Sequence, residues 1–212
     1  MNKLVDYLLE GIDDKSLTLL HESHNKELLK PDSSDSIYVS VIPEKSTLDI
    51  LECFTKDLMF LDLLGKLNGK VCDIDDYHTT IVYSRQGGQA IYDLIHHWGF
   101  DQKDTVYQTF SANIHPTKPL EFFGHFLVCK LQSESLSHFH DECLRNSGTF
   151  DFDQYNPHIT IAKVDKELLN SKEFAELVDY IELMNSQDAA ELSKTQFRFT
   201  SMNCEPLDVN RA

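Results

Sequence analysis

The sequence has no apolar run long enough to cross a bilayer. None of the hydrophobic segments in the 212 residues approaches the roughly 20 residues that a membrane-spanning helix needs. The first ten residues carry Asp6 and Glu10 inside their apolar stretch and lack a small-residue cleavage site, which disfavours a secretory signal. We therefore expect a cytoplasmic protein with no part in the membrane.

Basic residues are also scarce. The chain has 19 Lys and Arg against 35 Asp and Glu, a formal net charge of −16. A protein that binds long nucleic acid gains affinity by neutralising many phosphates with basic side chains, and this composition opposes that mode. Any phosphate-bearing ligand is expected to be small and to be held in a local site.

Cysteine and histidine do not occur in the spacings of metal sites. The five cysteines are widely scattered and form no Cys-x-x-Cys pair, which disfavours a disulfide framework and a thiolate zinc site. His21 and His24 share a helical face, but no further ligand is evident. His138, His140 and Cys143 would not converge on a helix, because positions two apart point in different directions. The sequence predicts neither a metal ion nor another cofactor.

The chain divides into an extension and one larger domain. Leucines recur at helical intervals among charges over most of residues 1–36, and a Pro/Asp/Ser-rich stretch ends this segment. We expect an N-terminal helical extension and linker over residues 1–36 and a single domain over 37–212.

Within the larger domain, a strand-helix-strand pattern occurs twice. The expected units are residues 37–42, 46–67 and 77–83, and residues 126–131, 133–148 and 158–162. Further elements are expected at helix 91–98, strand 106–114, helix 172–184 and strand 196–202. Alternating strands and helices with an internal duplication predict an α+β fold, with helices covering one side of one or two sheets.

Each unit ends on a strand that opens with His-x-Thr. Side chains two apart in a strand point to the same face, so His78 lies with Thr80 and His158 with Thr160. One neutral imidazole can accept a proton while a protonated one donates, and hydroxyls can bind phosphate oxygens. This combination indicates phosphoryl chemistry in a cleft between the two strands.

The alternating positions of the first strand, Thr79, Ile81 and Tyr83, are expected to face the helices. A third His-x-Thr string, His115 to Thr117, is interpreted as a loop or sheet edge, because Pro116 cannot donate to a sheet ladder.

A resemblance to the two-histidine (2H) phosphoesterases rests on two segments, residues 77–84 (YHTTIVYS) and 156–161 (NPHITI). Their bilobal fold has the same duplicated layout, which implies antiparallel sheets around a central cleft. More narrowly, the flanking residues from Asp76 to Arg85, the strand with Tyr38, and the run from Tyr155 to His158 resemble the phage anti-CBASS phosphodiesterases.

The resemblance implies an activity and further site residues. Enzymes of this family degrade cyclic oligonucleotide signals of bacterial immunity without a metal. It implies a cyclic di- or oligonucleotide substrate, the host bacterial cytosol as the place of action, His78, Thr80, His158 and Thr160 as catalytic residues, and substrate contacts from Tyr38 and Glu205.

Two alternatives stay open at this point. One is a 2H enzyme that opens 2′,3′-cyclic phosphates at RNA ends, which a basic approach surface would favour. The other is a protein that sequesters a cyclic nucleotide without cleaving it, which intact His-x-Thr pairs disfavour.

Aromatic residues supply candidates for stacking on a base. They are Tyr38, Tyr107, Phe110, Phe122 and Phe123. Arg85 and Lys163 fall out of phase with the catalytic faces, so no cation clamp is evident and neutral donors are expected to hold the phosphate.

Overall fold

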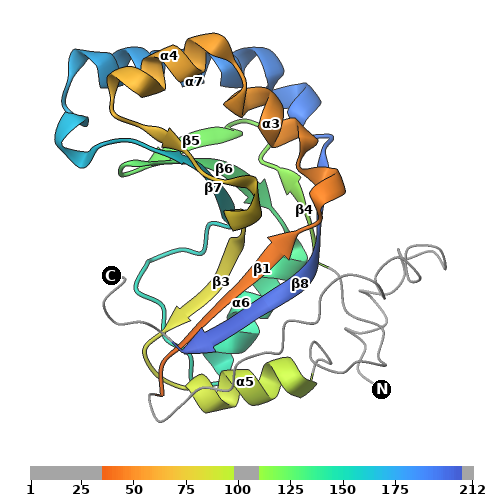
Figure 1. Ribbon diagram of the computed structural model, residues 1–212. Helices are drawn as coiled ribbons and strands as arrows, with labels where there is room; N and C mark the ends of the chain where they lie inside the picture. The colour runs from red at the N-terminus through yellow and green to blue at the C-terminus, as the bar shows by residue number, and fades with distance from the viewer. Residues whose placement is uncertain (1–34, 98–109, 207–212) are drawn as a thin grey trace.

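The computed structural model describes residues 35–97 and 110–206, which form a curved antiparallel sheet with helices on its outside (Figure 1). The strands are β1 (Ile37–Pro43), β2 (Lys70–Val71), β3 (Thr79–Ser84), β4 (Phe110–Ile114), β5 (Leu120–Phe123), β6 (Phe126–Gln132), β7 (His158–Lys163) and β8 (Gln196–Pro206). The helices are α3 (Asp49–Thr55), α4 (Leu58–Lys66), α5 (Gly88–His97), α6 (Glu134–Arg145) and α7 (Lys172–Leu192). The predicted α+β class and antiparallel pairing are confirmed.

The curvature brings the two His-x-Thr strands together. The strand order is β2-β7-β6-β4-β8-β1-β3, with β5 on the edge of β6, so β3 and β7 are far apart along the sheet. Figure 1 shows the sheet bent into an open curve, with α3, α4 and α7 above it, α6 behind β1 and β8, and α5 below. In space β3 and β7 contact each other.

The two faces of the sheet differ in chemistry. On the face toward the helices, Phe110 packs on Phe139 of α6 and Phe122 on Phe174 of α7, with ring centroids 5.4 and 4.9 Å apart. The opposite face, which we call the inner face, carries Tyr38, Thr80, Lys130, His158 and their neighbours. The sheet therefore buries one side in the core and leaves polar side chains on the other.

Both His-x-Thr strands contain a β-bulge at the same place. In the pairing of β3 with β1, Val82 and Thr80 oppose consecutive residues, which leaves Ile81 as the extra residue. In the pairing of β7 with β6, Ala162 and Thr160 oppose consecutive residues, which leaves Ile161 as the extra one. A bulge shifts the alternation of side chains beyond it.

The bulge corrects one prediction. Tyr83 does not face the helices, because it pairs directly with Tyr38 and their rings lie 6.3 Å apart on the inner face. Thr79 and Ile81 precede the shift and are fully buried, as expected.

Two side chains from the second unit hold the backbone of β3. The Tyr155 hydroxyl donates to the Thr80 carbonyl oxygen at 2.9 Å, and Nδ1 of the buried His140 donates to the Ile81 carbonyl oxygen at 2.6 Å. The two rings stack in parallel, with centroids 4.2 Å apart. Since Ile81 is the extra residue of the bulge, it has no direct partner in the pairing with β1, and His140 supplies a hydrogen-bond donor for its carbonyl oxygen.

Several predicted boundaries were wrong. The helix expected over residues 46–67 is divided into α3 and α4, because the Asp57 carboxylate accepts from the Phe60 N–H and caps a new helix. Helix α7 and strand β8 run further than predicted, and the short strands β2 and β5 were not predicted. Residues 1–34 and 98–109 lie outside the described residues, so most of the predicted extension and the first part of strand 106–114 are not tested.

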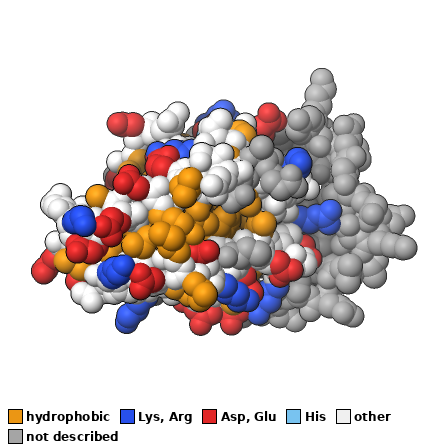
Figure 2. Space-filling model, turned by 90° about the horizontal axis from the view of Figure 1, so that it is seen from above, with side chains coloured by type: hydrophobic (Ala, Val, Ile, Leu, Met, Phe, Trp, Pro, Cys, Tyr) orange, Lys and Arg blue, Asp and Glu red, His pale blue; other side chains and the backbone are white. Residues whose placement is uncertain are grey.

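Part of the outer surface of the helices is hydrophobic. Seen from above, hydrophobic side chains gather over α4 and α7 (Figure 2), where Leu58, Met59 and Leu183 are exposed. Among the described residues, no helix combines the length and the apolar character that crossing a membrane requires.

The bond from Tyr155 to β3 gives a prediction about stability. Tyr155→Phe is expected to lower the free energy of unfolding by about 1 to 2 kcal/mol, because the mutation leaves a part-buried carbonyl oxygen without its donor. Urea unfolding followed by circular dichroism measures this. Tyr83→Phe is the matched control, since it removes one hydroxyl from a half-buried tyrosine of β3 itself and leaves the bond from Tyr155 to the Thr80 carbonyl oxygen in place. Equal unfolding midpoints for the two variants would contradict the role given to Tyr155.

Candidate functional site

His78 and His158 are held in the same way. Nδ1 of His78 donates to the carbonyl oxygen of Asp76, and Nδ1 of His158 donates to that of Asn156, each at 2.7 Å. In both cases the acceptor lies two residues earlier in the chain. A carbonyl oxygen accepts but cannot donate, so the neutral form of each ring carries its proton on Nδ1. Nε2 is then the atom that can exchange a proton with a ligand.

The two rings differ in their surroundings. His78 is exposed, whereas His158 is half-buried. Burial lowers the pKa of His158 from its ordinary value, and the positive charge of a protonated His78 lowers it further, against the opposing effect of the Asn156 carbonyl. His158 therefore favours the neutral form, and the two imidazoles come from strands that contact each other.

Tyr38 is the neighbour of three other predicted residues, His78, Thr80 and Glu205. The hydroxyls of Tyr38 and Thr80 are hydrogen-bonded at 3.0 Å, and the Tyr38 ring lies edge-on to His78 with centroids 6.3 Å apart. Glu205 of β8 is the direct cross-strand partner of Tyr38, which puts both on the inner face. Tyr38, Thr80, His78 and Glu205 thus form one side of the candidate site.

Phe123 is the aromatic neighbour of His158. It comes from β5, and its ring lies edge-on to the imidazole with centroids 5.0 Å apart. Thr160 follows His158 on the same face of β7, since Lys130 opposes His158 and Val128 opposes Thr160. Phe123 was one of five candidates for base stacking, and the sequence did not indicate which of the five lies beside a histidine.

The other candidates have different surroundings. Phe110 and Phe122 pack on the helices, and Tyr107 lies outside the described residues. Arg85 forms an ion pair with Asp151, with Nη2 and Oδ2 2.9 Å apart, and so does not point to a phosphate site.

Among the described residues, no group of three or more His, Cys, Asp and Glu side chains is arranged to hold a metal ion. The trio of α6 that the sequence analysis rejected does not converge, because His140 contacts the backbone of β3 and His138 lies 3.7 Å from Glu142. Two imidazoles whose Nδ1 atoms are bound to backbone carbonyl oxygens, together with Thr80 and Thr160, can instead perform acid-base chemistry through Nε2 and bind an oxyanion.

Two residues near the site were not found from the sequence. Tyr155 holds the Thr80 backbone, and Lys130 lies directly opposite His158 on the neighbouring strand. Lys130 occurs in the middle of an apolar strand, but only the register of β6 with β7 indicates what it faces.

Two of the known structures that match this chain share little sequence identity with it. The structure of Usb1 from Kluyveromyces marxianus has a TM-score of 0.49 at 10% identity, covering 84% of this chain and all of the other. The crystal structure of the MHV ns2 PDE domain has a TM-score of 0.34 at 20% identity, covering 62% of this chain and 80% of the other.

Sequence comparison identifies the family. A protein from Sphingomonas paeninsulae, the anti-CBASS protein Acb1, is 34% identical over 88 residues, which are 42% of this chain and only 14% of that protein. The model of the family described as anti-CBASS protein Acb1 matches residues 35–195, well over half of the chain and including both His-x-Thr motifs. The chain therefore belongs to the anti-CBASS protein Acb1 family.

Proposed function

We propose that this protein is a phosphodiesterase of the two-histidine type that hydrolyses 3′–5′ bonds of cyclic di- or oligonucleotides and thereby counteracts CBASS immunity. The observation that carries the proposal is the pair of imidazoles, each with Nδ1 bound to the carbonyl two residues earlier, on strands that contact each other. Membership of the anti-CBASS protein Acb1 family supports the choice of substrate class.

The reaction needs one proton acceptor and one proton donor. A ribose hydroxyl or a water molecule attacks phosphorus while a neutral imidazole takes its proton through Nε2. As the bond from phosphorus to the 5′ oxygen breaks, a protonated imidazole gives its proton to that oxygen. Thr80 and Thr160 donate hydrogen bonds to the non-bridging oxygens. No step requires a metal ion or another cofactor.

The lowered pKa of His158 supports one choice of roles for the two histidines. Because burial favours the neutral form of its ring, His158 acts as the base, and the exposed His78 acts as the acid. Tyr38 and Phe123 bind the bases of the nucleotide by stacking, and Glu205 accepts hydrogen bonds from the nucleotide.

Removal of either histidine is expected to lower kcat by about 10²- to 10⁴-fold, the usual contribution of one positioned acid or base. His78→Ala and His158→Ala are compared with wild type on a 3′,3′-cyclic dinucleotide, after circular dichroism has shown that each variant is folded. His97→Ala is the matched control, because His97 is an exposed histidine of α5. Activity near the wild-type level in either folded variant would refute the mechanism.

Substrate class is tested with purified protein in EDTA. One reaction contains a 3′,3′-cyclic dinucleotide, and another contains an oligoribonucleotide that ends in a 2′,3′-cyclic phosphate. We expect chromatography to show cleavage of the cyclic dinucleotide alone. Cleavage of the RNA end alone would identify an RNA-end enzyme, and tight binding without product would identify a sequestering protein. Loss of all activity in EDTA would contradict the metal-free reaction.

The electrostatics of His158 give a separate prediction. Its pKa, measured by NMR titration, is expected to lie below the ordinary 6.5, so kcat/KM persists at mildly acidic pH and falls as the pH drops through this pKa. Phe123→Ala is expected to raise the pKa by exposing the ring to water, and His78→Ala to raise it by removing a like charge. His97→Ala is expected to leave it unchanged. A pKa of His158 above 6.5 in wild type would reverse the assignment of base and acid.

A further inference from the structure

A cation lies beside His158 in a protein whose net charge is −16. Lys130 of β6 is the direct cross-strand partner of His158, so both side chains stand on the inner face. The Lys130 side chain is only 19% exposed. A half-enclosed ammonium group next to a candidate catalytic residue is a strong attractor for an anion, because water screens it less than a surface charge.

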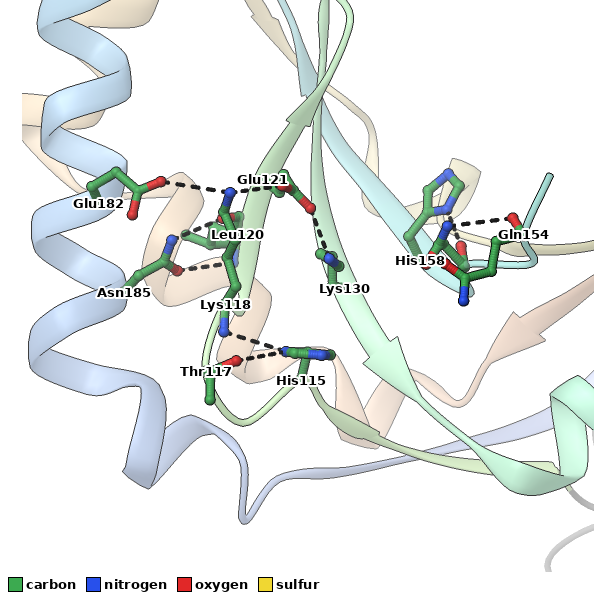
Figure 3. Close-up of polar contacts among 11 residues, drawn as sticks. His115, Thr117, Lys118, Leu120, Glu121, Lys130, Gln154, His158, Glu182 and Asn185 are labelled. Carbon is green, nitrogen blue, oxygen red and sulfur yellow. Dashed lines mark hydrogen bonds and ion pairs between the residues drawn. The ribbon is translucent and has the colours of Figure 1, made fainter. Parts of the chain in front are cut away.

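Lys130 forms an ion pair with Glu121, and Glu121 also forms an ion pair with Lys118. Its Nζ lies 2.7 Å from Oε2 of Glu121, while Oε1 of Glu121 lies 2.7 Å from Nζ of Lys118 (Figure 3). Burial raises the pKa of Glu121, but the hydrogen bonds from Lys118 and Lys130 outweigh it and leave the pKa lowered. One carboxylate thus faces two ammonium groups. Glu182 is 3.7 Å from Lys118 and 58% exposed, so it adds little.

Because Glu121 also pairs with Lys118, Lys130 can exchange Glu121 for another anionic partner. Breaking a buried ion pair is costly when one partner is left without compensation. If Lys130 turns to an anion on the inner face, Glu121 keeps Lys118, and no charge is left unpaired. An incoming phosphate then replaces Glu121 as the partner of Lys130.

His115 belongs to the same surroundings and explains the third His-x-Thr string. Its backbone N–H donates to the Lys130 carbonyl oxygen, and its Nδ1 accepts from the Lys118 N–H at 3.3 Å. Burial and the charge of Lys130 lower the pKa of His115. Its Nδ1 is thus an acceptor, opposite to the arrangement in His78 and His158, so His115 is not a third member of that pair.

We propose that Lys130 binds a second phosphate of the substrate, next to the phosphate that is cleaved between His78 and His158. This inference rests on the proposed function. It makes the enzyme selective for nucleotides with at least two phosphodiester groups, as in a cyclic dinucleotide. Glu121 competes with that phosphate for Lys130 and sets the affinity.

The test compares a cyclic dinucleotide, which has two phosphates, with the dinucleoside monophosphate of the same bases, which has one. Lys130→Gln is expected to raise KM for the cyclic dinucleotide by roughly 10- to 100-fold, as for loss of a charge-assisted hydrogen bond. The variant is expected to leave kcat within about threefold and KM for the dinucleoside monophosphate within about twofold. A structural role would change both substrates alike, and such a result, or no change at all, would overturn the proposal.

Glu121→Gln tests whether Glu121 competes with the second phosphate for Lys130 or only holds Lys130 in position. Freed from its carboxylate partner, Lys130 is expected to bind the second phosphate more tightly, so KM for the cyclic dinucleotide falls. An increase in KM would show that Glu121 only positions Lys130 and would overturn the exchange. Lys172→Gln is the control, because it removes the same charge from an exposed site on α7 and is expected to change neither KM.

The outcomes distinguish this inference from the proposed function. If wild type cleaves neither substrate, the phosphodiesterase proposal fails, and calorimetric binding of the cyclic dinucleotide to wild type and Lys130→Gln still tests Lys130. A weaker Kd in the variant supports the second-phosphate site, and an equal Kd overturns it. The absence of measurable binding to wild type overturns both.

Discussion

The candidate site depends on how β3 is held at the end of the sheet. β3 is the last strand in the order, and among the strands that the structure describes it pairs with β1 alone. Tyr155 and His140 donate to the Thr80 and Ile81 carbonyl oxygens on this strand. Because both donors belong to the second strand-helix-strand unit, these bonds connect the two halves of the molecule at Thr80, two residues from His78. Tyr155 and His140 therefore help to fix the position of the strand that carries His78 and Thr80.

The chemistry of the site is local and opposes the average character of the chain. The overall charge is strongly negative, yet the inner face carries His158 directly opposite Lys130. Glu121 is held by two lysines, and Asp76 presents its backbone rather than its carboxylate to His78. A net charge of −16 opposes the binding of long nucleic acid, and the proposed substrate is a compact nucleotide held at a local site. The proposed preference for two phosphates follows from this contrast.

Local patterns in the sequence predicted the elements that their own residues determine. Alternation in residues 37–42 and 158–162 predicted β1 and β7, and the spacing of His and Thr placed each pair on one face. The break between α3 and α4 was missed, although Asp57 is an ordinary capping residue, because the leucine periodicity continues across it. The positions of Tyr83 and Lys130 were not predictable, since a bulge and the strand register decide them. Both depend on partner strands distant in the chain.

The sequence by itself determined the α+β class, the antiparallel strands that carry the two motifs, and the chemical groups available to the site. These properties follow from periodicity and side-chain chemistry within short segments. Only the tertiary structure decided which groups lie together: Tyr38 beside His78, Glu205 opposite Tyr38, Phe123 beside His158, and Lys130 opposite His158. The reason is that the curvature and register of the sheet arise from long-range packing, which no single segment contains.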